Sequence, residues 1–294
     1  MSKILWASAL LFSLLASPPL SAQGPHHFEP GFNLFSKEQD VQLGEEAAAQ
    51  VRKQMTVIND PDLTAYVSRV GKRLAATQEA QASGFPFTFE VVADPTINAF
   101  ALPGGHMFIH TGLLKAVDNE AQLAGVMGHE MSHVILRHGT SQASKANLIE
   151  LPLMLAQQIT NKDSMMGKLE QLGLGLGATG LLLRFSRGAE SQADLTGSHL
   201  MAESGYDPVE MAHFFDKLSG PGKGLAGNVE QFMSDHPNPG NREQAIEDEA
   251  RLLPAQKYGY ETGDFKRMKS VVKKIHEPPP KPQPAQQQPS SEQR

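Results

Sequence analysis

Residues 129–133 read His-Glu-Met-Ser-His, two histidines four positions apart with a glutamate directly after the first. On a helix, positions i and i+4 differ by about 40° in direction, so both imidazoles leave one face and can bind a single cation. Glu130 lies about 100° round from His129, beside such a cation, where a general base for a metal-bound water would stand. Apolar residues flank the motif at helical spacing: Leu123, Val126, Met127, Val134 and Ile135.

The motif therefore predicts a buried helix from Asn119 to about Arg137, capped by Asp118, with a metal site on one face. A helix that carries two surface histidines and a glutamate by chance is the alternative. At the residue frequencies of this chain, about 0.03 such matches are expected by chance, so we favour the metal site.

The chain contains no cysteine, so any metal ligands must come from its 11 histidines and 32 carboxylates. This composition excludes disulfide frameworks, thiolate zinc sites and thiol nucleophiles. The formal net charge is −6, which argues against a partner bound through nucleic-acid phosphates. A site held by imidazole and carboxylate is typical of catalytic rather than closed structural zinc.

A third ligand is expected, because catalytic zinc usually has three protein ligands. Glu190 is the favoured candidate, and Asp194, four residues later on the same predicted helix, would accept the second ring N–H of His129 or His133. An ordinary solvated acidic face is the alternative. His138 is excluded as the third ligand, because it lies nine residues, about two and a half turns, after His129 and so faces the opposite side of the helix. His199, nine residues after Glu190, is excluded for the same reason.

The predicted fold class is α+β and mainly helical. A capping box at Ser36 and Gln39 predicts a helix to about Ile58, and Asp60-Pro61 begins a helix to Thr77. A strand is predicted over 85–92, and a hairpin pairs 98–102 with 106–110 around Pro103-Gly104-Gly105. Further helices are predicted over four ranges: 143–160, 186–203, 208–218 and 239–253.

The ends of the chain differ in composition from its centre. Residues 1–22 combine Lys3, an apolar run and small residues, which predicts a cleaved signal peptide. An uncleaved anchor is the alternative, but a run of twelve residues is short for a bilayer span. Residues 23–35 are predicted to be loose, 36–276 to form the folded domain, and the Pro/Gln-rich 277–294 to be disordered. No membrane span is predicted in the mature protein.

Four motifs together resemble the gluzincin metallopeptidases, the family that includes HtpX and the CAAX prenyl protease. They are His129–His133, Arg187-x-x-Glu190-x-x-Ala193-Asp194, the Asn98–Gly105 hairpin and Ser234-Asp235-His236-Pro237. Within that family the chain is most similar to the soluble, exported BepA-like type, without its C-terminal helical repeats. The resemblance implies a zincin-like metalloprotease domain, with a small sheet whose edge strand lies beside the active-site helix.

The resemblance also implies the roles of individual residues. One Zn²⁺ per chain would be bound by His129, His133 and Glu190, with Glu130 as the general base. His236 would either donate to the oxyanion or cap the zinc in a resting state. Substrate backbone would pair with the strand edge at Asn98, Ala99 and Phe100.

The leading hypothesis is an exported, periplasmic zinc endopeptidase that cleaves unfolded or misassembled envelope proteins, with a secreted enzyme as the alternative location. A chaperone-like binding module with a repressed metal site is the second hypothesis, and a structural or storage zinc protein is the third. Polypeptides are the expected partners, with peripheral contact to the membrane or to envelope-assembly machinery as a further option. The Gly-rich, apolar stretch from Leu172 to Leu183 is interpreted either as part of a lid or as a buried core helix.

Overall fold

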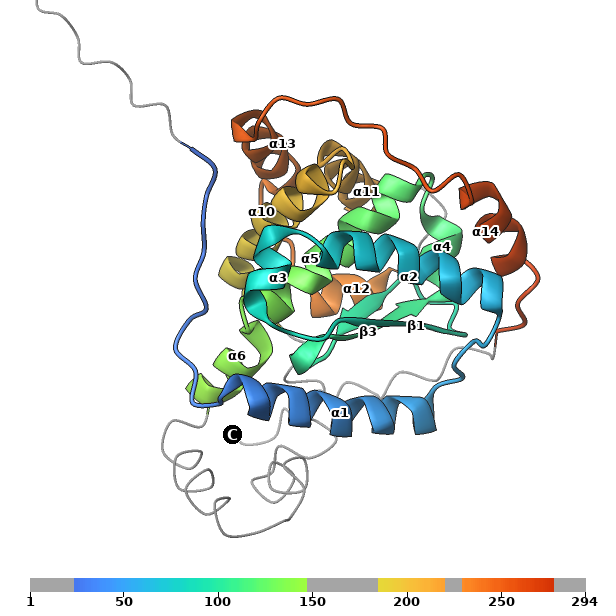
Figure 1. Ribbon diagram of the computed structural model, residues 1–294, viewed down its shortest axis with the longest axis horizontal. Helices are drawn as coiled ribbons and strands as arrows, with labels where there is room; N and C mark the ends of the chain where they lie inside the picture. The colour runs from blue at the N-terminus through green and yellow to red at the C-terminus, as the bar shows by residue number, and fades with distance from the viewer. Residues whose placement is uncertain (1–23, 147–184, 220–228, 278–294) are drawn as a thin grey trace, which may run out of the picture.

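A small mixed sheet separates two groups of helices in the computed structural model, which describes residues 24–146, 185–219 and 229–277 (Figure 1). The strand order is β1-β3-β2, with β1 parallel and β2 antiparallel to β3. The strands are β1 (Thr88–Val92), β2 (Ala99–Ala101) and β3 (His106–His110). Strand β2 is an edge strand, and it lies beside the helix that carries the His-Glu-x-x-His motif. The mainly helical fold class with a small sheet is confirmed.

The helices of the described residues occur in three runs along the chain. Before the sheet come α1 (Lys37–Gln54), α2 (Pro61–Ala75) and α3 (Gln78–Ser83). The short 3₁₀ helix η1 (Pro103–Gly105) joins β2 to β3, after which α4 (Thr111–Ala116), α5 (Glu120–Ile135) and α6 (His138–Ala146) follow. The C-terminal part contains α10 (Arg187–Glu203), α11 (Val209–Ser219), α12 (Glu230–Asp235), α13 (Arg242–Leu252) and α14 (Phe265–Val272).

Each face of the sheet packs on a different set of helices, because side chains alternate along a strand. Met107 and Ile109 of β3 belong to the large apolar cluster shared with α2, α5, α10 and α11. Phe108 points the other way and packs in a smaller cluster with α1. In Figure 1, α1 accordingly lies below the sheet and the remaining helices lie mostly above it. The metal-site motif is on the side of the larger cluster.

Helix α1 approaches the sheet connection closely because position 44 is a glycine. A Cβ built on Gly44 would lie 1.7 Å from the carbonyl oxygen of Pro103 in η1. Gly104 in η1 adopts a φ of 78°, a left-handed conformation that glycine tolerates and most residues do not. These two glycines fix the position of α1 relative to β2.

Several predicted helix starts are confirmed by their caps. Ser36 and Gln39 form the capping box of α1, and Asp60 and Ser186 accept from backbone N–H groups at the starts of α2 and α10. The prediction that Asp118 caps the next of these helices, α5, is wrong. The neighbouring Asn119 caps α5, accepting from the N–H of Gln122.

Some predicted boundaries are also wrong. Helix α1 ends at Gln54 rather than Ile58, because Val57 bridges to Val92 and the N–H of Ile58 donates to the carbonyl of Val91. Helix α6 begins at His138, five residues before the predicted start, and 147–160 lie outside the described residues. Four helices were not predicted, α3, α4, α12 and α14, of which the first three have only six residues each. Helices of six residues have fewer than two turns, too few for a periodic pattern of apolar residues to show in the sequence.

Three other sequence predictions fall wholly or mostly outside the described residues. They concern the signal peptide over 1–22, the stretch Leu172–Leu183 and the tail over 277–294, of which only Glu277 is described. Residues 24–35 contain no helix or strand. Among the described helices, none combines the length and apolar character that a bilayer crossing needs.

Candidate metal centre

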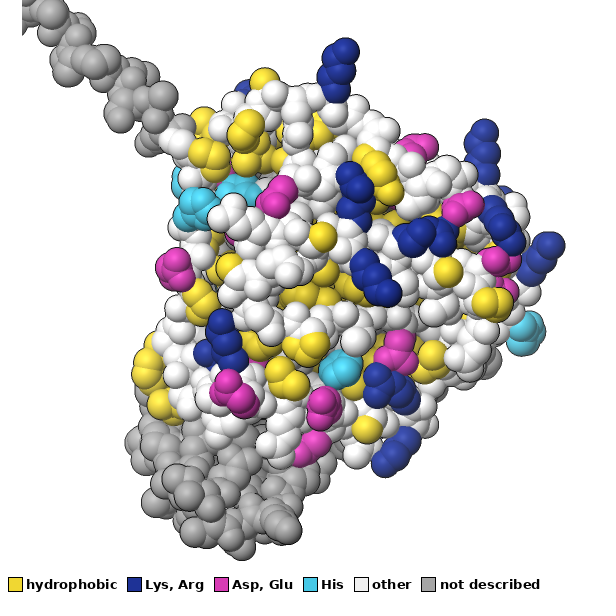
Figure 2. All heavy atoms as spheres, viewed as in Figure 1, with side chains coloured by type: hydrophobic (Ala, Val, Ile, Leu, Met, Phe, Trp, Pro, Cys, Tyr) yellow, Lys and Arg dark blue, Asp and Glu magenta, His cyan; other side chains and the backbone are white. Residues whose placement is uncertain are grey.

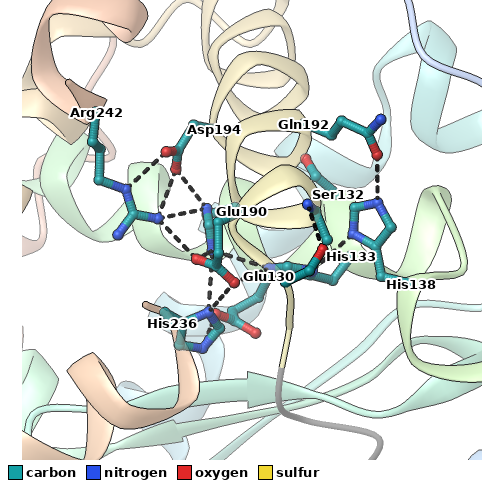
Figure 3. Close-up of polar contacts among 12 residues, drawn as sticks. Glu130, Ser132, His133, His138, Glu190, Gln192, Asp194, His236 and Arg242 are labelled. Carbon is teal, nitrogen blue, oxygen red and sulfur yellow. Dashed lines mark hydrogen bonds and ion pairs between the residues drawn. The ribbon is translucent and has the colours of Figure 1, made fainter. Parts of the chain in front are cut away.

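The contact between α5 and α10 brings the two parts of the candidate site together. At their crossing, a Cβ built on Gly197 of α10 would lie 3.1 Å from the backbone nitrogen of His129. Glycine at this position therefore lets α10 pack close to α5. The approach places Glu190 and Asp194, two turns and one turn earlier on α10, in contact with His129. Glu190 also lies beside His133 (Figure 3).

Four buried side chains direct one donor atom each towards a common point: His129, His133, Glu190 and His236. His129 Nε2 lies 3.1 Å from His133 Nε2 and 3.4 Å from Glu190 Oε2. His133 Nε2 lies 3.4 Å from Glu190 Oε1. His236, at the C-terminal cap of α12, places Nδ1 3.3 Å from His129 Nε2 and 3.2 Å from Glu190 Oε1.

These distances fit a tetrahedral metal ion. Zn²⁺ binds imidazole nitrogen at about 2.0–2.1 Å, and a tetrahedron of that radius has donor atoms about 3.3–3.4 Å apart. The separations of 3.1–3.4 Å, which involve both oxygens of Glu190, are close to this size, and one donor atom from each of the four residues lies within 4.8 Å of the others. All four side chains are at most 3% exposed, and a cation would offset the repulsion between their lone pairs. The donor set of imidazole and carboxylate therefore fits zinc.

The outward ring nitrogens of the two α5 histidines are both hydrogen-bonded. His129 Nδ1 lies 2.9 Å from Asp194 Oδ1, so the N–H donates to this carboxylate. His133 Nδ1 lies 2.9 Å from His138 Nδ1, and His138 Nε2 lies 3.1 Å from Gln192 Oε1. Because the Gln192 oxygen can only accept, His138 must donate from Nε2 and accept at Nδ1. His133 then donates from Nδ1, which leaves its Nε2 lone pair for a metal.

The prediction that His138 faces the opposite side is therefore wrong. That prediction assumed a continuous helix, but α5 ends at Ile135 and Arg137 adopts a left-handed φ of 55°. The turn begins α6 and returns His138 to His133 (Figure 3). His138 is outside the four-donor group, but it orients one of its members. His199 lies away from this site, as predicted.

Arg242 is a further site residue that the sequence patterns did not predict. The first residue of α13, it donates two hydrogen bonds of 2.8 Å to Asp194 and one of 3.2 Å to Glu190. Its guanidinium also stacks 3.7 Å from the centre of the Phe215 ring. Burial alone would lower the pKa of Arg242, but the neighbouring Asp194 outweighs that effect and raises it. Arg242 thus holds a permanent positive charge that partly balances the buried carboxylates.

Glu130 is buried beside the donor group without belonging to it. Its Oε1 makes no hydrogen bond within the described part of the chain and lies 3.3 Å from His236 Nε2. Burial raises the pKa of Glu130 above its usual range, which suits a carboxylate that must exchange protons near neutral pH. The backbone of Ala101 in β2 also contacts it, so Glu130 lies between the metal site and the strand edge.

The residues predicted to bind substrate occupy or adjoin the edge strand β2. Asn98 is buried, with its Nδ2 3.5 Å from Asp235, the residue before His236. Ala99 is fully buried, whereas the Phe100 side chain stacks on Phe108, towards α1 and away from the metal site. A substrate would therefore meet the backbone of this strand rather than the Phe100 ring.

The metal-site groups perturb one another's pKa values strongly. Burial lowers the pKa of His129, but hydrogen bonds to Asp194 and Glu190 outweigh this and raise it to about 9. Burial lowers the pKa of His133 far below its usual range and that of His138 to about 4. Because a metal binds the unprotonated imidazole nitrogen, the raised pKa of His129 makes protonation compete with metal binding.

A buried His-Glu-x-x-His helix, a glutamate donor from a second helix and an edge strand alongside define the class of HExxH metallopeptidases. The sequence pattern of peptidase family M48 matches residues 61–250. The chain belongs to this family, which confirms the resemblance drawn from the four motifs.

Several relatives of known name are similar over most of this chain. It is 32% identical to the beta-barrel assembly-enhancing protease of Yersinia pestis over 251 residues, covering 80% of this chain and 51% of that protein. It is 32% identical to the Escherichia coli K12 protein of the same name, covering 69% of this chain and 42% of the relative. Mitochondrial metalloendopeptidase OMA1 of Schizosaccharomyces pombe is 33% identical, and the match covers 68% of this chain and 56% of that relative. The chain thus spans about half the length of these relatives.

Proposed function

We propose that this protein is a zinc-dependent endopeptidase with one catalytic Zn²⁺ per chain, bound by His129, His133 and Glu190. The observation that carries the proposal is the convergence of these buried donors within 4.8 Å of one another, beside the buried carboxylate of Glu130. Zinc bound there would polarise a peptide carbonyl and increase the acidity of a water molecule.

The protein's own residues then carry the proton. Glu130 accepts a proton from the attacking water and donates it to the leaving amine, because its carboxylate is next to the donor group and its pKa is raised by burial. Asp194 and His138 hold the metal-binding imidazoles in the required tautomers. Arg242 holds the carboxylates of Glu190 and Asp194 in place through charge-assisted hydrogen bonds.

His236 caps the site in this conformation, which we assign to the resting state. Its Nδ1 is the fourth donor, so no position is open for water or substrate. Its Nε2 points at Glu130, the proposed base. Rotation of His236 away from the group would open the metal and release Glu130 together. The other role weighed for His236, donation to the oxyanion, requires the side chain to leave this position first.

The proposed substrates are unfolded or misassembled envelope polypeptides, cleaved after export to the periplasm. An extended chain added to the free edge of β2 would be held by backbone hydrogen bonds, which impose little sequence preference. The export proposal rests on the signal-like sequence of residues 1–22. The name of the Yersinia pestis relative, a beta-barrel assembly-enhancing protease, supports a role in the envelope.

Glu130→Gln tests the role of the general base. The variant should bind zinc with wild-type stoichiometry but lose cleavage of an unfolded substrate such as casein, by at least ~100-fold, since the amide cannot accept the proton. Zinc content by mass spectrometry and casein cleavage measure the two effects. Wild-type cleavage rates in this variant, or loss of zinc along with activity, would contradict the assignment.

His236→Ala tests the cap. If His236 occupies the fourth position at rest, the variant should keep its zinc and cleave casein faster than the wild type. His213→Ala is the matched control, because His213 is an exposed histidine on α11 that pairs only locally with Glu210. A slower variant that retains zinc would instead assign His236 to the oxyanion, and wild-type kinetics would remove it from the site.

The four-donor arrangement also favours a second function, a binding module that holds unfolded chains and seldom cleaves them. A fully capped metal is what such a protein would show. Casein cleavage that a chelator abolishes would favour the peptidase. Chelator-insensitive binding of unfolded protein without cleavage, in both the wild type and His236→Ala, would favour the binding module.

A further inference from the structure

A second cluster of histidines and glutamates lies at the surface, where residues 24–28 pass α3, α10 and α13. Its members are His26, His27, Glu79 of α3, His199 of α10 and Glu249 of α13. In Figure 1 this N-terminal segment, in dark blue, runs down the side of the molecule beside these helices. In Figure 2 histidine and acidic side chains lie together in the same region. Neither the sequence motifs nor the proposed peptidase site uses these residues.

Three of these side chains place one donor atom each close enough together to share a metal ion. His27 Nδ1 lies 3.1 Å and His199 Nδ1 3.3 Å from the same oxygen, Oε1 of Glu79. All three donor atoms lie within 4.8 Å of one another. The two measured separations match the edge of about 3.3–3.4 Å expected for a tetrahedral zinc site. They also match the separations in the buried site, although the residues come from different elements.

The second nitrogen of His199 is held by a buried carboxylate. His199 Nε2 lies 2.7 Å from Oε1 of Glu249, whose side chain is 1% exposed. An ionised carboxylate only accepts, so His199 donates from Nε2. Its Nδ1 faces Oε1 of Glu79 at 3.3 Å, and between that nitrogen and the carboxylate there must be either a proton on Nδ1 or a metal ion. A carboxylate behind a histidine is the arrangement that commonly supports metal-binding imidazoles. Asp194 does the same for His129 in the buried site.

The same carboxylate also fixes the segment that carries His27. The backbone N–H of His26 donates to Glu249 Oε1 at 2.7 Å, and its Nδ1 lies 2.5 Å from Oε2. His27 is thereby positioned beside His199, with the two rings edge to face at 5.8 Å. Glu249 therefore arranges two of the three donors before any metal binds.

We propose that His27, Glu79 and His199 form a second metal site, which binds one Zn²⁺ and links the N-terminal segment to α3 and α10. The donor set of two imidazoles and one carboxylate suits zinc among the biological divalent cations. His27 is largely exposed, so the fourth position is open to water. The metal would fasten the N-terminal segment to α10, the helix that supplies Glu190 and Asp194. The surface site does not depend on peptidase activity at the buried site.

Zinc stoichiometry of the full-length chain tests this proposal. Equilibrium dialysis against Zn²⁺, with bound metal counted by mass spectrometry, should give two zinc ions per chain for the wild type. His27→Ala and Glu79→Gln should each give one, because each removes a donor from the surface site. Because His27 lies in a segment without helix or strand, its replacement by alanine should leave the folded core intact.

Two controls separate this site from other sources of zinc. His213→Ala should keep two ions, since His213 forms only a local pair with Glu210. His133→Ala should lose only the buried ion, so a failure of the proposed peptidase site and a failure of the surface site give different results. The proposal is overturned if the wild type binds one ion that His27→Ala retains, which would mean that protonated histidines alone neutralise Glu79 and Glu249. It is also overturned if a second ion persists in both His27→Ala and Glu79→Gln.

Discussion

A histidine can contribute to a metal site without touching the metal, and His138 shows how. It accepts from Nδ1 of His133 and donates its own Nε2–H to Gln192, so the tautomer of a proposed ligand is set from two residues away. The corresponding partner of His129 is a carboxylate, Asp194. The two proposed ligands on α5 thus have supports of different charge. Burial lowers the pKa of His133, whereas for His129 the hydrogen bond to Asp194 helps to outweigh burial and raises the pKa.

Replacing His138 should weaken zinc binding about 10- to 100-fold, the usual cost of losing such a support. His138→Leu keeps most of the volume but offers no acceptor, whereas His138→Asn retains a carbonyl oxygen. We expect the leucine variant to lose affinity and the asparagine variant to lose less, measured by competition with a chelator of known affinity. Equal affinities in both variants and the wild type would show that His138 does not orient His133.

Residue identities in the site were largely predictable, because the motif spacing constrains them. Two helices that contact each other carry the five predicted residues: His129, Glu130 and His133 on α5, and Glu190 and Asp194 on α10. Helical periodicity predicts how the residues on each helix lie relative to one another. Arg242 and His138 were not predictable in the same way. Arg242 contacts residues about 50 positions earlier, and the role of His138 depends on a turn at Arg137 that no local pattern marked.

At the level of elements, the best-predicted features were those with a chemical signature at their ends. Capping side chains identified the starts of α1 and α2, because they satisfy backbone N–H groups that would otherwise lack partners. The end of α1 was missed because a long-range bridge between Val57 and Val92 competes with the helix. Such competition is set by tertiary contacts, which a local sequence pattern does not contain.

The contact between α1 and η1 yields a prediction for stability. Gly44→Ala would bring a methyl group 1.7 Å from the Pro103 carbonyl, so α1 must shift away from the sheet. We expect a loss of about 1–3 kcal/mol in the free energy of unfolding, measured with urea. Gly188→Ala in the first turn of α10 is the control, because its nearest neighbour would be 3.9 Å away. A Gly44→Ala protein as stable as the control would show that α1 moves without cost.

For the whole molecule, two groups make stability depend on pH on the acid side. Burial lowers the pKa of His138 to about 4, so between its unfolded value of about 6.5 and 4 only the unfolded chain binds the proton. Burial alone would raise the pKa of Asp94, but hydrogen bonds from His110 and Thr96 outweigh it and lower the pKa to about 2. The stability that Asp94 contributes is therefore fully present above a pH of about 3.9, the unfolded-state pKa, and is lost as the pH falls towards 2.

The free energy of unfolding should accordingly fall as the pH is lowered from 6.5, and fall further below 4. Asp94→Asn should be less stable than the wild type at pH 6, by about 1–2 kcal/mol, and the difference should shrink as the pH approaches 3. Asp248→Asn, at an exposed position on α13, is the comparison. A difference between Asp94→Asn and wild type that stays constant from pH 6 to pH 3 would contradict a lowered pKa for Asp94 in the folded protein.

The four donors of the buried site come from three separate helices, and His129 and His236 are 107 positions apart in the chain. During synthesis, His129 and His133 leave the ribosome well before Glu190, and His236 follows last. The incomplete chain therefore exists for a time with two metal-binding histidines but neither the carboxylate nor the cap. The four-donor group becomes complete only when α12 has packed and brought in His236. If His236 caps the metal as proposed, a newly folded molecule would begin in the covered state.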